Sequence, residues 1–448
     1  MESALFYLEK RASEPWIIGE NSDRFFDYTQ QALAEINTFL QGGILPKILI
    51  AEADPIRFVA DFLVAIASEC PVFLGNYQWG QNEWGQVLNL VQPNLVWGLD
   101  YQIESQDYSG KFWRNDIMIP TGGSSGNIRF AIHTWQTLTA SVSGFCKYFE
   151  TDIVNSFCIL PVCHVSGLMQ FIRSLVTGGR LVISPFKQLD FNKFNYLNFD
   201  NFFISLVPSQ LEKILSTEPQ YLSRFKNVLL GGAPAWEELL EKARNTQIRL
   251  APTYGMTETA SQIVTLKPED FLKGNSSSGK VLPHAEVLIE NQVVKIQAKS
   301  LYLGYYPNRG KTEDITFKTD DLGYFDDQGY LHILGRNSHK IITGGENVFP
   351  SAVEAVIRST NLVQDVCVIG LEDTYWGQVV TAVYVPINEG VKSQAIASLI
   401  SPQIAKFKQP KYWISVTSIS RNIQGKVNQQ ELLNMATNWL QQNLSNLS

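Results

Sequence analysis

The feature that most limits the possible fold is an alternation of short apolar segments with amphipathic ones. Residues 47–52 (KILIAE) and 71–75 (PVFLG) are typical of buried strands, and residues 57–69 (RFVADFLVAIASE) between them carry apolar side chains at helical spacing. The alternation recurs through about three quarters of the chain. Because crossover helices cover both faces of a parallel or mixed sheet, this pattern predicts an α/β fold.

The pattern changes toward the C-terminus. Residues 279–335 alternate over short strands, which predicts a β-rich subdomain. The segments after Arg336 favour a smaller α+β unit, so we expect a large N-terminal domain at 1–335 and a small, mobile C-terminal domain at 336–448. Residues 336–448 carry nine Lys or Arg and seven Asp or Glu, a net charge of +2. Since the whole chain has a net charge of −7, the large domain carries −9. An anionic ligand would suit the space between them.

Composition excludes several classes of protein. The 448 residues are 45% hydrophobic, enough for a large core, and a net charge of −7 argues against a nucleic-acid binder. No apolar stretch approaches the roughly 18 residues of a membrane span, and the N-terminal residues lack the pattern of a signal peptide. The five cysteines contain no C-x-x-C pair, which disfavours a disulfide framework or zinc ribbon. We therefore expect a soluble cytoplasmic protein without a membrane span.

One glycine-rich loop remains after the common nucleotide motifs are tested. No two glycines lie two residues apart, so the G-x-G of a dinucleotide fold is absent, and Gly310-Lys311-Thr312 fails as a P-loop because Tyr305 replaces its first glycine. The loop 121–126 (TGGSSG) joins the apolar segments DIMIP and IRFAIHT. Its glycines and hydroxyls could bring several donors to an anion, but the loop alone also fits an ordinary hairpin turn.

Further motifs follow this loop in a fixed order. They are LPVCHVSG (160–167), LLGGAP (229–234), TYGMTE (253–258), TDDLG (319–323), GRNSHKIITGGENVFPSAVE (335–354) and RNIQGK (421–426). This order resembles the adenylate-forming superfamily of acyl-CoA synthetases, luciferases and peptide-synthetase adenylation domains, over about residues 115–430. Within that superfamily, the string TYGMTETASQIV (253–264) and the compact length resemble the acid–CoA ligases of menaquinone and phylloquinone synthesis.

The resemblance implies a ligase reaction with two steps. A carboxylate attacks the α-phosphorus of ATP to give an acyl-AMP and pyrophosphate, and the thiol of coenzyme A then attacks the acyl-adenylate carbonyl. The implied partners are ATP, Mg²⁺, coenzyme A and a small aromatic dicarboxylate, with no carrier protein. Because an anion meets a polyanion in the first step, the site must supply positive potential.

The resemblance also implies roles for individual residues around the nucleotide. The expected phosphate contacts are Thr121, Gly122, Gly123, Ser124, Ser125, Gly126, Arg129 and Thr257. Glu258 would hold Mg²⁺, which proteins bind through few carboxylates together with phosphate oxygens and water. The expected adenine pocket comprises Gly231, Gly232, Ala233, Tyr254 and Gly255. Asp321 would accept from the ribose hydroxyls, reinforced by Arg336.

The remaining implied roles concern the acyl group and the thiol. Lys426 would reach the α-phosphate and the attacking carboxylate, and His164 would line the acyl pocket. Gly344 and Gly345 would line the approach of the thiol. Since Lys426 and the glycines serve different steps, a rotation of the small domain at Ser338 would exchange them.

Several of these positions also have an ordinary structural explanation. The alternatives are a solvated loop acid for Glu258, a core aromatic for Tyr254, a turn cap for Asp321, a near-core histidine for His164, a solvated lysine for Lys426, and a strand–helix turn at Gly231-Gly232 with Pro234 opening the helix. Cys163 and His164, adjacent on an extended segment, would point opposite ways and form no nucleophilic dyad.

The chain departs from the superfamily pattern at three places. Ile128, Arg129 and Phe130 stand where Pro-Lys-Gly is usual, Asp320 where Gly or Asn is commoner, and Ser338 where the hinge residue is usually Asp or Lys. Three rival functions stay open: another acyl- or aryl-CoA ligase, a stand-alone adenylation enzyme serving a carrier protein, and a degenerate nucleotide-binding scaffold. The lack of an Asp near His164 for an α-amino group disfavours amino-acid substrates.

Overall fold

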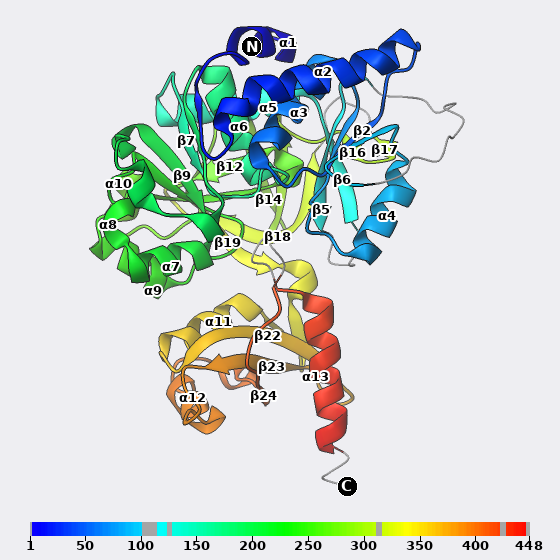
Figure 1. Cartoon of the computed structure of the whole chain (residues 1–448). Coiled ribbons are helices and arrows are strands. Elements are labelled where there is room, and N and C mark those ends of the chain that lie inside the picture. Colours follow the sequence, from blue (N-terminus) through cyan, green and yellow to red (C-terminus); the bar gives the residue numbers. More distant parts are fainter. Residues whose placement is uncertain (1, 101–113, 123–127, 311–315, 422–426, 445–448) are drawn as a thin grey trace.

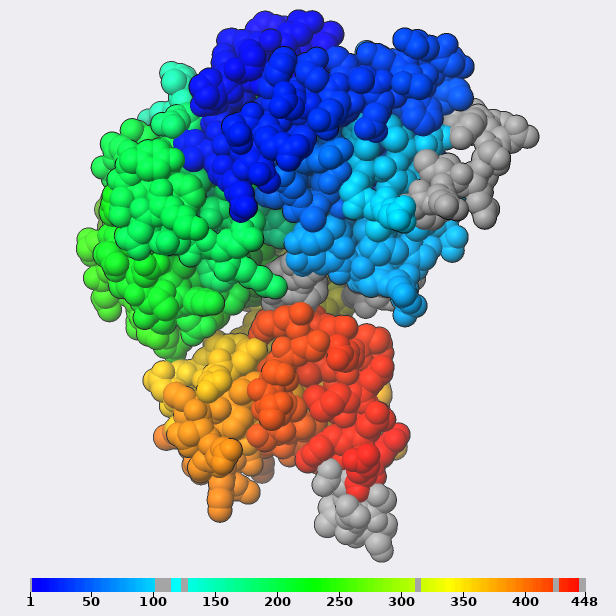
Figure 2. All heavy atoms as spheres, viewed as in Figure 1, coloured from blue at the N-terminus to red at the C-terminus, as the bar shows by residue number. Residues whose placement is uncertain are grey.

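The computed structural model describes residues 2–100, 114–122, 128–310, 316–421 and 427–444. A large body formed by the first three quarters of the chain stands above a smaller one formed by the last quarter (Figure 1), and Figure 2 shows the two in contact across a narrow waist. Every helix in the described ranges is too short or too polar to cross a membrane.

The first large sheet has eight strands in the order β1-β8-β7-β9-β10-β11-β12-β13. Its pairs are parallel from β1 to β11 and antiparallel from there on. The strands are β1 (Ile17–Ile18), β7 (Asn155–Cys158), β8 (Leu181–Ile183), β9 (Phe202–Leu206), β10 (Asn227–Leu230), β11 (Leu250–Met256), β12 (Ser261–Thr265) and β13 (Lys280–Val281). The two motifs LLGGAP and TYGMTE therefore follow or end neighbouring strands of one sheet.

The second large sheet has seven strands in the order β17-β16-β6-β5-β3-β2-β4. They are β2 (Ile48–Ile50), β3 (Val72–Leu74), β4 (Leu95–Trp97), β5 (Ile117–Gly122), β6 (Ile128–His133), β16 (Gly304–Tyr305) and β17 (Asn308–Arg309). β5 and β6 form the antiparallel hairpin that carries the glycine-rich loop. The strands that flank the loop are thus paired as a hairpin, while residues 123–127 of the loop itself lie outside the described residues.

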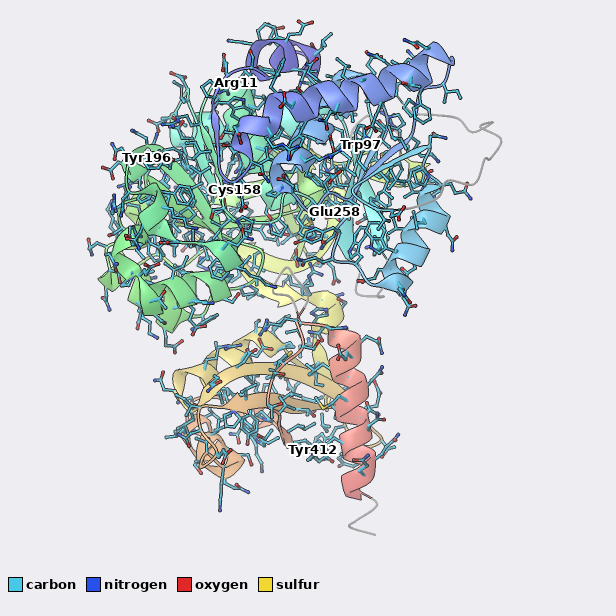
Figure 3. All side chains as sticks on the ribbon, in the orientation of Figure 1. Arg11, Trp97, Cys158, Tyr196, Glu258 and Tyr412 are labelled. Atoms are coloured by element: carbon cyan, nitrogen blue, oxygen red, sulfur yellow. The ribbon has the colours of Figure 1, made fainter. Side chains whose placement is uncertain are left out.

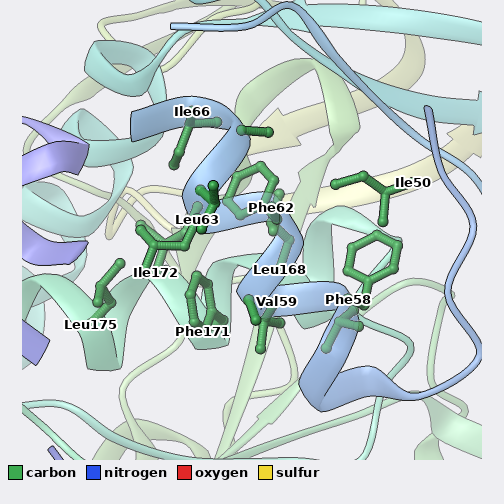
Figure 4. Packing of buried hydrophobic residues seen from close by; sticks show 14 of the residues in the cluster. Ile50, Phe58, Val59, Phe62, Leu63, Ile66, Leu168, Phe171, Ile172 and Leu175 are labelled. Atoms are coloured by element: carbon green, nitrogen blue, oxygen red, sulfur yellow. The ribbon is translucent and has the colours of Figure 1, made fainter. Parts of the chain in front are cut away.

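Helices α3 (Pro55–Ala67) and α6 (Val165–Thr177) form the centre of the largest apolar core. α3 begins at an Asp54 cap followed by proline, as its sequence favours. Figure 4 shows the two helices interdigitating, with the rings of Phe62 and Phe171 edge to face at 6.2 Å. Each fully buried side chain of this size contributes about 1.5–3 kcal/mol. The core therefore holds α6, which begins beside the candidate acyl pocket, firmly in place.

The remaining helices of the large body cover the sheets (Figure 1). They are α1 (Ala4–Arg11), α2 (Phe25–Gln41), α4 (Gln81–Val91), α5 (Trp135–Phe149), α7 (Pro208–Thr217), α8 (Pro219–Leu222), α9 (Glu237–Asn245) and α10 (Pro268–Leu272). Most of the predicted β-rich segment, residues 279–335, forms a third, antiparallel sheet in the order β14-β15-β18-β19, while its strands β13, β16 and β17 join the two large sheets. The strands of the third sheet are β14 (Ala285–Glu290), β15 (Val293–Ala298), β18 (Phe317–Phe325) and β19 (Leu331–Arg336).

The last quarter of the chain forms a five-stranded sheet with three helices. The strands are β20 (Ile341–Thr343), β21 (Glu346–Val348), β22 (Val363–Asp373), β23 (Gly377–Pro386) and β24 (Tyr412–Ser415), and the helices are α11 (Pro350–Ser359), α12 (Ser393–Ile400) and α13 (Gln429–Leu444). The predicted class, a large α/β body with a β-rich part and a small α+β unit, is confirmed.

Candidate active site

Glu258 lies in a short 3₁₀ turn inside the large body. The turn, η5 (Thr257–Thr259), joins β11 to β12, and Glu258 is only 7% exposed (Figure 3). Its Oε1 accepts a hydrogen bond from the Tyr305 hydroxyl at 2.6 Å, and its backbone carbonyl accepts from the Tyr302 N–H at 2.8 Å. Burial and the neighbouring carboxylate raise the pKa of Tyr305. Glu258 is therefore not a solvated loop acid.

The β5–β6 hairpin brings a cation to the same place. Thr121 and Arg129 are directly opposed in the hairpin, so their side chains share one face. The Arg129 guanidinium lies 4.3 Å from the centre of the Tyr305 ring, which also bonds Glu258. The hairpin and the η5 turn thus meet at one tyrosine. Four expected phosphate contacts and one expected catalytic residue lie outside the described residues: Gly123, Ser124, Ser125, Gly126 and Lys426.

The Asp321 carboxylate has two partners, Tyr254 and Arg336. Tyr254 is distant in sequence, and Arg336 lies on the neighbouring strand. Its Oδ2 accepts from the Tyr254 hydroxyl at 2.8 Å, and its Oδ1 lies 3.4 Å from Nε of Arg336, its direct partner in the β18–β19 register. Asp321 is 8% exposed, so the turn-cap explanation does not describe it. Burial and Asp321 raise the pKa of Tyr254. The predicted Asp321–Arg336 pairing is present, and Tyr254 joins it through its hydroxyl.

The glycines after β10 are required by close packing. A Cβ on Gly231 would stand 2.5 Å from Oγ1 of Thr253, and Gly232 has a φ of +83°, which favours glycine. The two strands β10 and β11 therefore approach each other closely beside Tyr254. One detail of the sequence prediction is wrong: Pro234 does not open the following helix, because α9 starts at Glu237 after Trp236.

His164 caps α6 at the end of the turn that follows β7. The backbone N–H of His164 donates to the carbonyl of Pro161 at 3.1 Å, so Cys163 and His164 lie in a turn and not on an extended segment, as the sequence argument assumed. The absence of a reactive dyad rests on a different reason. Burial raises the pKa of Cys163 to about 12, which opposes formation of a thiolate.

The two glycines expected near the thiol form the turn between β20 and β21. Gly344 and Gly345 have φ values of +57° and +84°, and a Cβ on Gly344 would stand 2.8 Å from the Trp376 ring. Close by in sequence, the backbone N–H of Ser338 donates to Oδ1 of Asp320 at 3.1 Å, and its hydroxyl donates to Oδ2. Two residues that depart from the superfamily pattern, Asp320 and Ser338, are therefore bonded to each other.

Sequence reasoning missed three residues around this site. Tyr305 and His133 contact the η5 turn, and the buried Arg173 of α6 donates to Ser261 and Gln262, which follow that turn. His133 and Arg173 could have been found, because each is a polar residue within an otherwise apolar segment: His133 in IRFAIHT and Arg173 in LMQFIRSLV. Tyr305 gave no such signal, because an aromatic side chain in a short strand is ordinary.

The donor set of the η5 turn fits Mg²⁺ held with a nucleotide. Glu258 offers a carboxylate with one oxygen already bonded to Tyr305, and such outer hydrogen bonds orient metal ligands. The described residues contain no cluster of three or more His, Cys, Asp or Glu that could hold a metal by itself. A single carboxylate that shares the ion with phosphate oxygens and water matches the preference of Mg²⁺.

Comparisons with known proteins identify the family of this chain. The family model for AMP-binding enzymes matches residues 104–298, and that for the C-terminal domain of AMP-binding enzymes matches 352–426. The 2-succinylbenzoate–CoA ligase of Listeria monocytogenes is 34% identical, over 95% of this chain and 98% of that protein, and that of Listeria innocua is 34% identical over 71% and 70%. The chain belongs to the AMP-binding enzyme family.

Solved structures share the fold along nearly the whole chain. The o-succinylbenzoate CoA synthetase of Bacillus subtilis in complex with the acyl-adenylate intermediate OSB-AMP gives a TM-score of 0.82 at 23% identity, covering 96% of this chain and 98% of that one. The same protein in complex with ATP and magnesium ion gives 0.79 at 23% identity, covering 96% and 99%. At this level of identity the likeness supports the fold of both bodies.

Proposed function

We propose that this protein is an AMP-forming acid–CoA ligase that converts 2-succinylbenzoate, ATP and coenzyme A to 2-succinylbenzoyl-CoA, AMP and pyrophosphate. A carboxylate oxygen of the acid bonds to the α-phosphorus as pyrophosphate leaves, and the thiol sulfur then bonds to the acyl carbonyl as AMP leaves. The observation that carries the proposal is the 34% identity to the Listeria monocytogenes ligase over 95% of the chain. Such a reaction belongs to menaquinone or phylloquinone synthesis.

In this proposal the η5 turn and the β5–β6 hairpin bind the triphosphate end of ATP. Glu258 holds Mg²⁺, which screens the phosphate charge, and Thr257 hydrogen-bonds the α-phosphate. Thr121 and Arg129 contact the outer phosphates from the shared face of the hairpin. The cation–π contact of Arg129 with Tyr305 supports this role, because it holds a positive charge beside the Glu258 turn.

The nucleoside end of ATP lies at the third sheet. Asp321 accepts from the ribose hydroxyls, since a carboxylate offers about four acceptor sites and Tyr254 uses one of them. The turn at Gly231-Gly232-Ala233, packed against β11, provides a side-chain-free wall for adenine beside Tyr254 and Gly255. The bond from the Tyr254 hydroxyl to Asp321 restrains the ring beside this wall.

A buried cation fixes the position of α6, the helix that His164 precedes. Arg173 is 2% exposed, burial lowers its pKa to about 10, and its Nε has no hydrogen-bond partner among the described residues. A buried charge is costly unless it is paired. Ser261, Gln262 and the Phe145 ring partner the Arg173 guanidinium. Arg173 therefore anchors α6 against β12, while His164 at the start of α6 would line the acyl pocket.

The small domain, residues 336–448, supplies groups for both steps. Lys426 serves acyl-AMP formation, and the Gly344–Gly345 turn lines the approach of the thiol. A rotation of the small domain at Ser338 exchanges Lys426 and the Gly344–Gly345 turn at the reacting carbonyl. The bond of Ser338 to Asp320 holds the position of the small domain in this structure. The acyl acceptor is coenzyme A and no carrier protein. The described cysteines are all free, which suits work in the reducing cytoplasm.

One experiment tests this function directly. The protein is incubated with 2-succinylbenzoate, ATP, Mg²⁺ and coenzyme A, and the thioester is sought by mass spectrometry beside AMP and pyrophosphate. 3-Benzoylpropionate, which keeps the aromatic keto-acid chain but lacks the carboxylate on the ring, is the matched control acid. If no thioester forms with 2-succinylbenzoate but another acid is turned over, that acid replaces 2-succinylbenzoate as the proposed substrate. Thermal shifts with nucleotide but without any turnover would indicate a nucleotide-binding scaffold.

A further inference from the structure

His133 is the last residue of β6, and its ring is completely buried. Its Nε2 lies 2.8 Å from the backbone carbonyl oxygen of Thr257, and its Nδ1 lies 3.0 Å from the hydroxyl of Thr137. Both ring nitrogens therefore have a partner. The contact to Thr257 reaches from the strand that carries the glycine-rich loop to the residue directly before Glu258.

The partners fix the protonation state of the ring. A carbonyl oxygen only accepts, so Nε2 carries the hydrogen and donates it to Thr257. Burial lowers the pKa of His133 to about 4, so the ring is neutral at physiological pH and Nδ1 accepts. The Thr137 hydroxyl accepts from the Thr134 N–H at 3.0 Å, and its single hydrogen can go either to Nδ1 or to the Thr134 carbonyl oxygen at 2.9 Å. The ring is therefore a neutral, buried spacer whose bond to Thr257 is fixed in direction.

The segment that His133 holds has an unfavourable backbone. Ala260 and Ser261, directly after η5, have φ values of +51° and +85°, a region that residues with a Cβ rarely occupy. Such a conformation persists only where its surroundings over-determine it. Here the carbonyl of Thr257 is bonded by His133, and that of Glu258 by the Tyr302 N–H. β6 and the segment just before β16 thus hold two carbonyls of the turn from outside, and Ser141 of α5 donates to the carbonyl of Ala260 at 2.8 Å.

We propose that His133 is a positioning residue that sets the distance between the phosphate-binding hairpin and the Glu258 carboxylate. Without its bond, the carbonyl of Thr257 keeps only the N–H of Ala260, a donor of the turn itself at 3.1 Å, so nothing outside the turn holds this carbonyl and the strained turn relaxes. Glu258 then no longer faces the ion that the phosphates on the hairpin share. This inference rests on the proposed role of Glu258 in holding Mg²⁺ with ATP. It assigns to His133 no contact with substrate and no proton transfer.

The test compares two substitutions. His133→Leu keeps an apolar side chain of moderate size but donates nothing, whereas His133→Gln retains both a donor and an acceptor. Phe199→Leu, in a separate apolar core, controls for loss of stability alone. Each variant is titrated with Mg²⁺ at saturating ATP while pyrophosphate release is measured, and thioester formation is measured from preformed acyl-AMP. The thermal shifts produced by AMP and by ATP with Mg²⁺ provide a readout without turnover.

We expect His133→Leu to raise the half-saturating Mg²⁺ concentration about 10- to 100-fold. Its thermal shift with ATP and Mg²⁺ should shrink while that with AMP persists, and thioester formation from acyl-AMP should stay near that of the unmodified protein. His133→Gln should recover most of the Mg²⁺ response. An unchanged Mg²⁺ dependence in His133→Leu, or equal losses in both steps, overturns the proposal. If His133→Leu does not fold, His133→Gln is compared with His133→Asn, whose shorter side chain should not reach Thr257. An equally weak Mg²⁺ response in these two variants overturns the proposal. Failure of the proposed function would instead show in the unmodified protein.

Discussion

Replacing Tyr305 by phenylalanine removes one hydroxyl from the candidate metal site. That hydroxyl donates to Oε1 of Glu258 at 2.6 Å, while the ring under Arg129 is retained in the variant. A hydrogen bond to a charged group contributes about 1.5–3 kcal/mol, and 1.4 kcal/mol corresponds to about tenfold in a binding constant. Because Glu258 loses the partner that orients it, we expect the half-saturating Mg²⁺ concentration to rise about 10- to 100-fold.

The assay follows the initial rate of pyrophosphate release against free Mg²⁺, with 2-succinylbenzoate and ATP saturating. Tyr324→Phe is the matched control, because Tyr324 is an exposed tyrosine of β18 that stacks on His332. The control should behave as the unmodified protein. A Tyr305→Phe variant that needs less Mg²⁺ would mean that the hydroxyl competes with the ion for Glu258. That result, or an unchanged requirement, would refute the orienting role.

Three further perturbations test other parts of the molecule. Lys426→Ala should cost about 3–4 kcal/mol in acyl-AMP formation but little in thioester formation from preformed acyl-AMP, and equal losses would contradict its assignment. Ser338→Pro removes the backbone N–H that donates to Asp320 at 3.1 Å, and it fixes the backbone φ at this position. CoA transfer should therefore slow about tenfold or more while pyrophosphate release persists. An unchanged rate of thioester formation would exclude a hinge at Ser338. Burial raises the pKa of Asp61 to about 8 from 3.8, so its native form stays protonated while the unfolded chain ionises, and stability falls as pH rises between these values. In urea unfolding, the stability of Asp61→Asn relative to the unmodified protein should therefore rise by on the order of 5 kcal/mol between pH 4 and pH 8.

The fold class could be predicted because apolar strands and amphipathic helices alternate with clear periods. The division into two large sheets could not, since β3 and β8 have the same apolar character but join different sheets. β1, only two residues long, pairs with β8 more than 160 positions away, and nothing local in the sequence indicates this partner. Strand choice of this kind depends on non-local packing, which periodicity does not encode.

The site divides in a similar way. Glu258 and Asp321 could be predicted because the motifs that contain them are short and contiguous. Their partners could not, because Tyr305 follows Glu258 by 47 positions and Tyr254 precedes Asp321 by 67. Each tyrosine reaches its carboxylate only after separate strands have assembled. The misplaced start of α9 has a local cause: Pro234 suits a first helical turn, but the tight Gly231-Gly232 turn extends the chain to Trp236 before the helix begins.

The two tyrosines share a physical logic that links the fold to the chemistry. Tyr305 bonds one oxygen of Glu258, and Tyr254 bonds one oxygen of Asp321. A neutral donor orients a carboxylate without cancelling its charge, whereas a lysine in the same place would compete with the ligand. Burial raises the pKa of both phenols, so each remains a donor across the physiological pH range. Each carboxylate thus receives one bond from a neutral phenol, in Asp321 beside its ion pair with Arg336, and keeps acceptor capacity, which in the proposed function would suit Glu258 to a cation and Asp321 to a pair of hydroxyls.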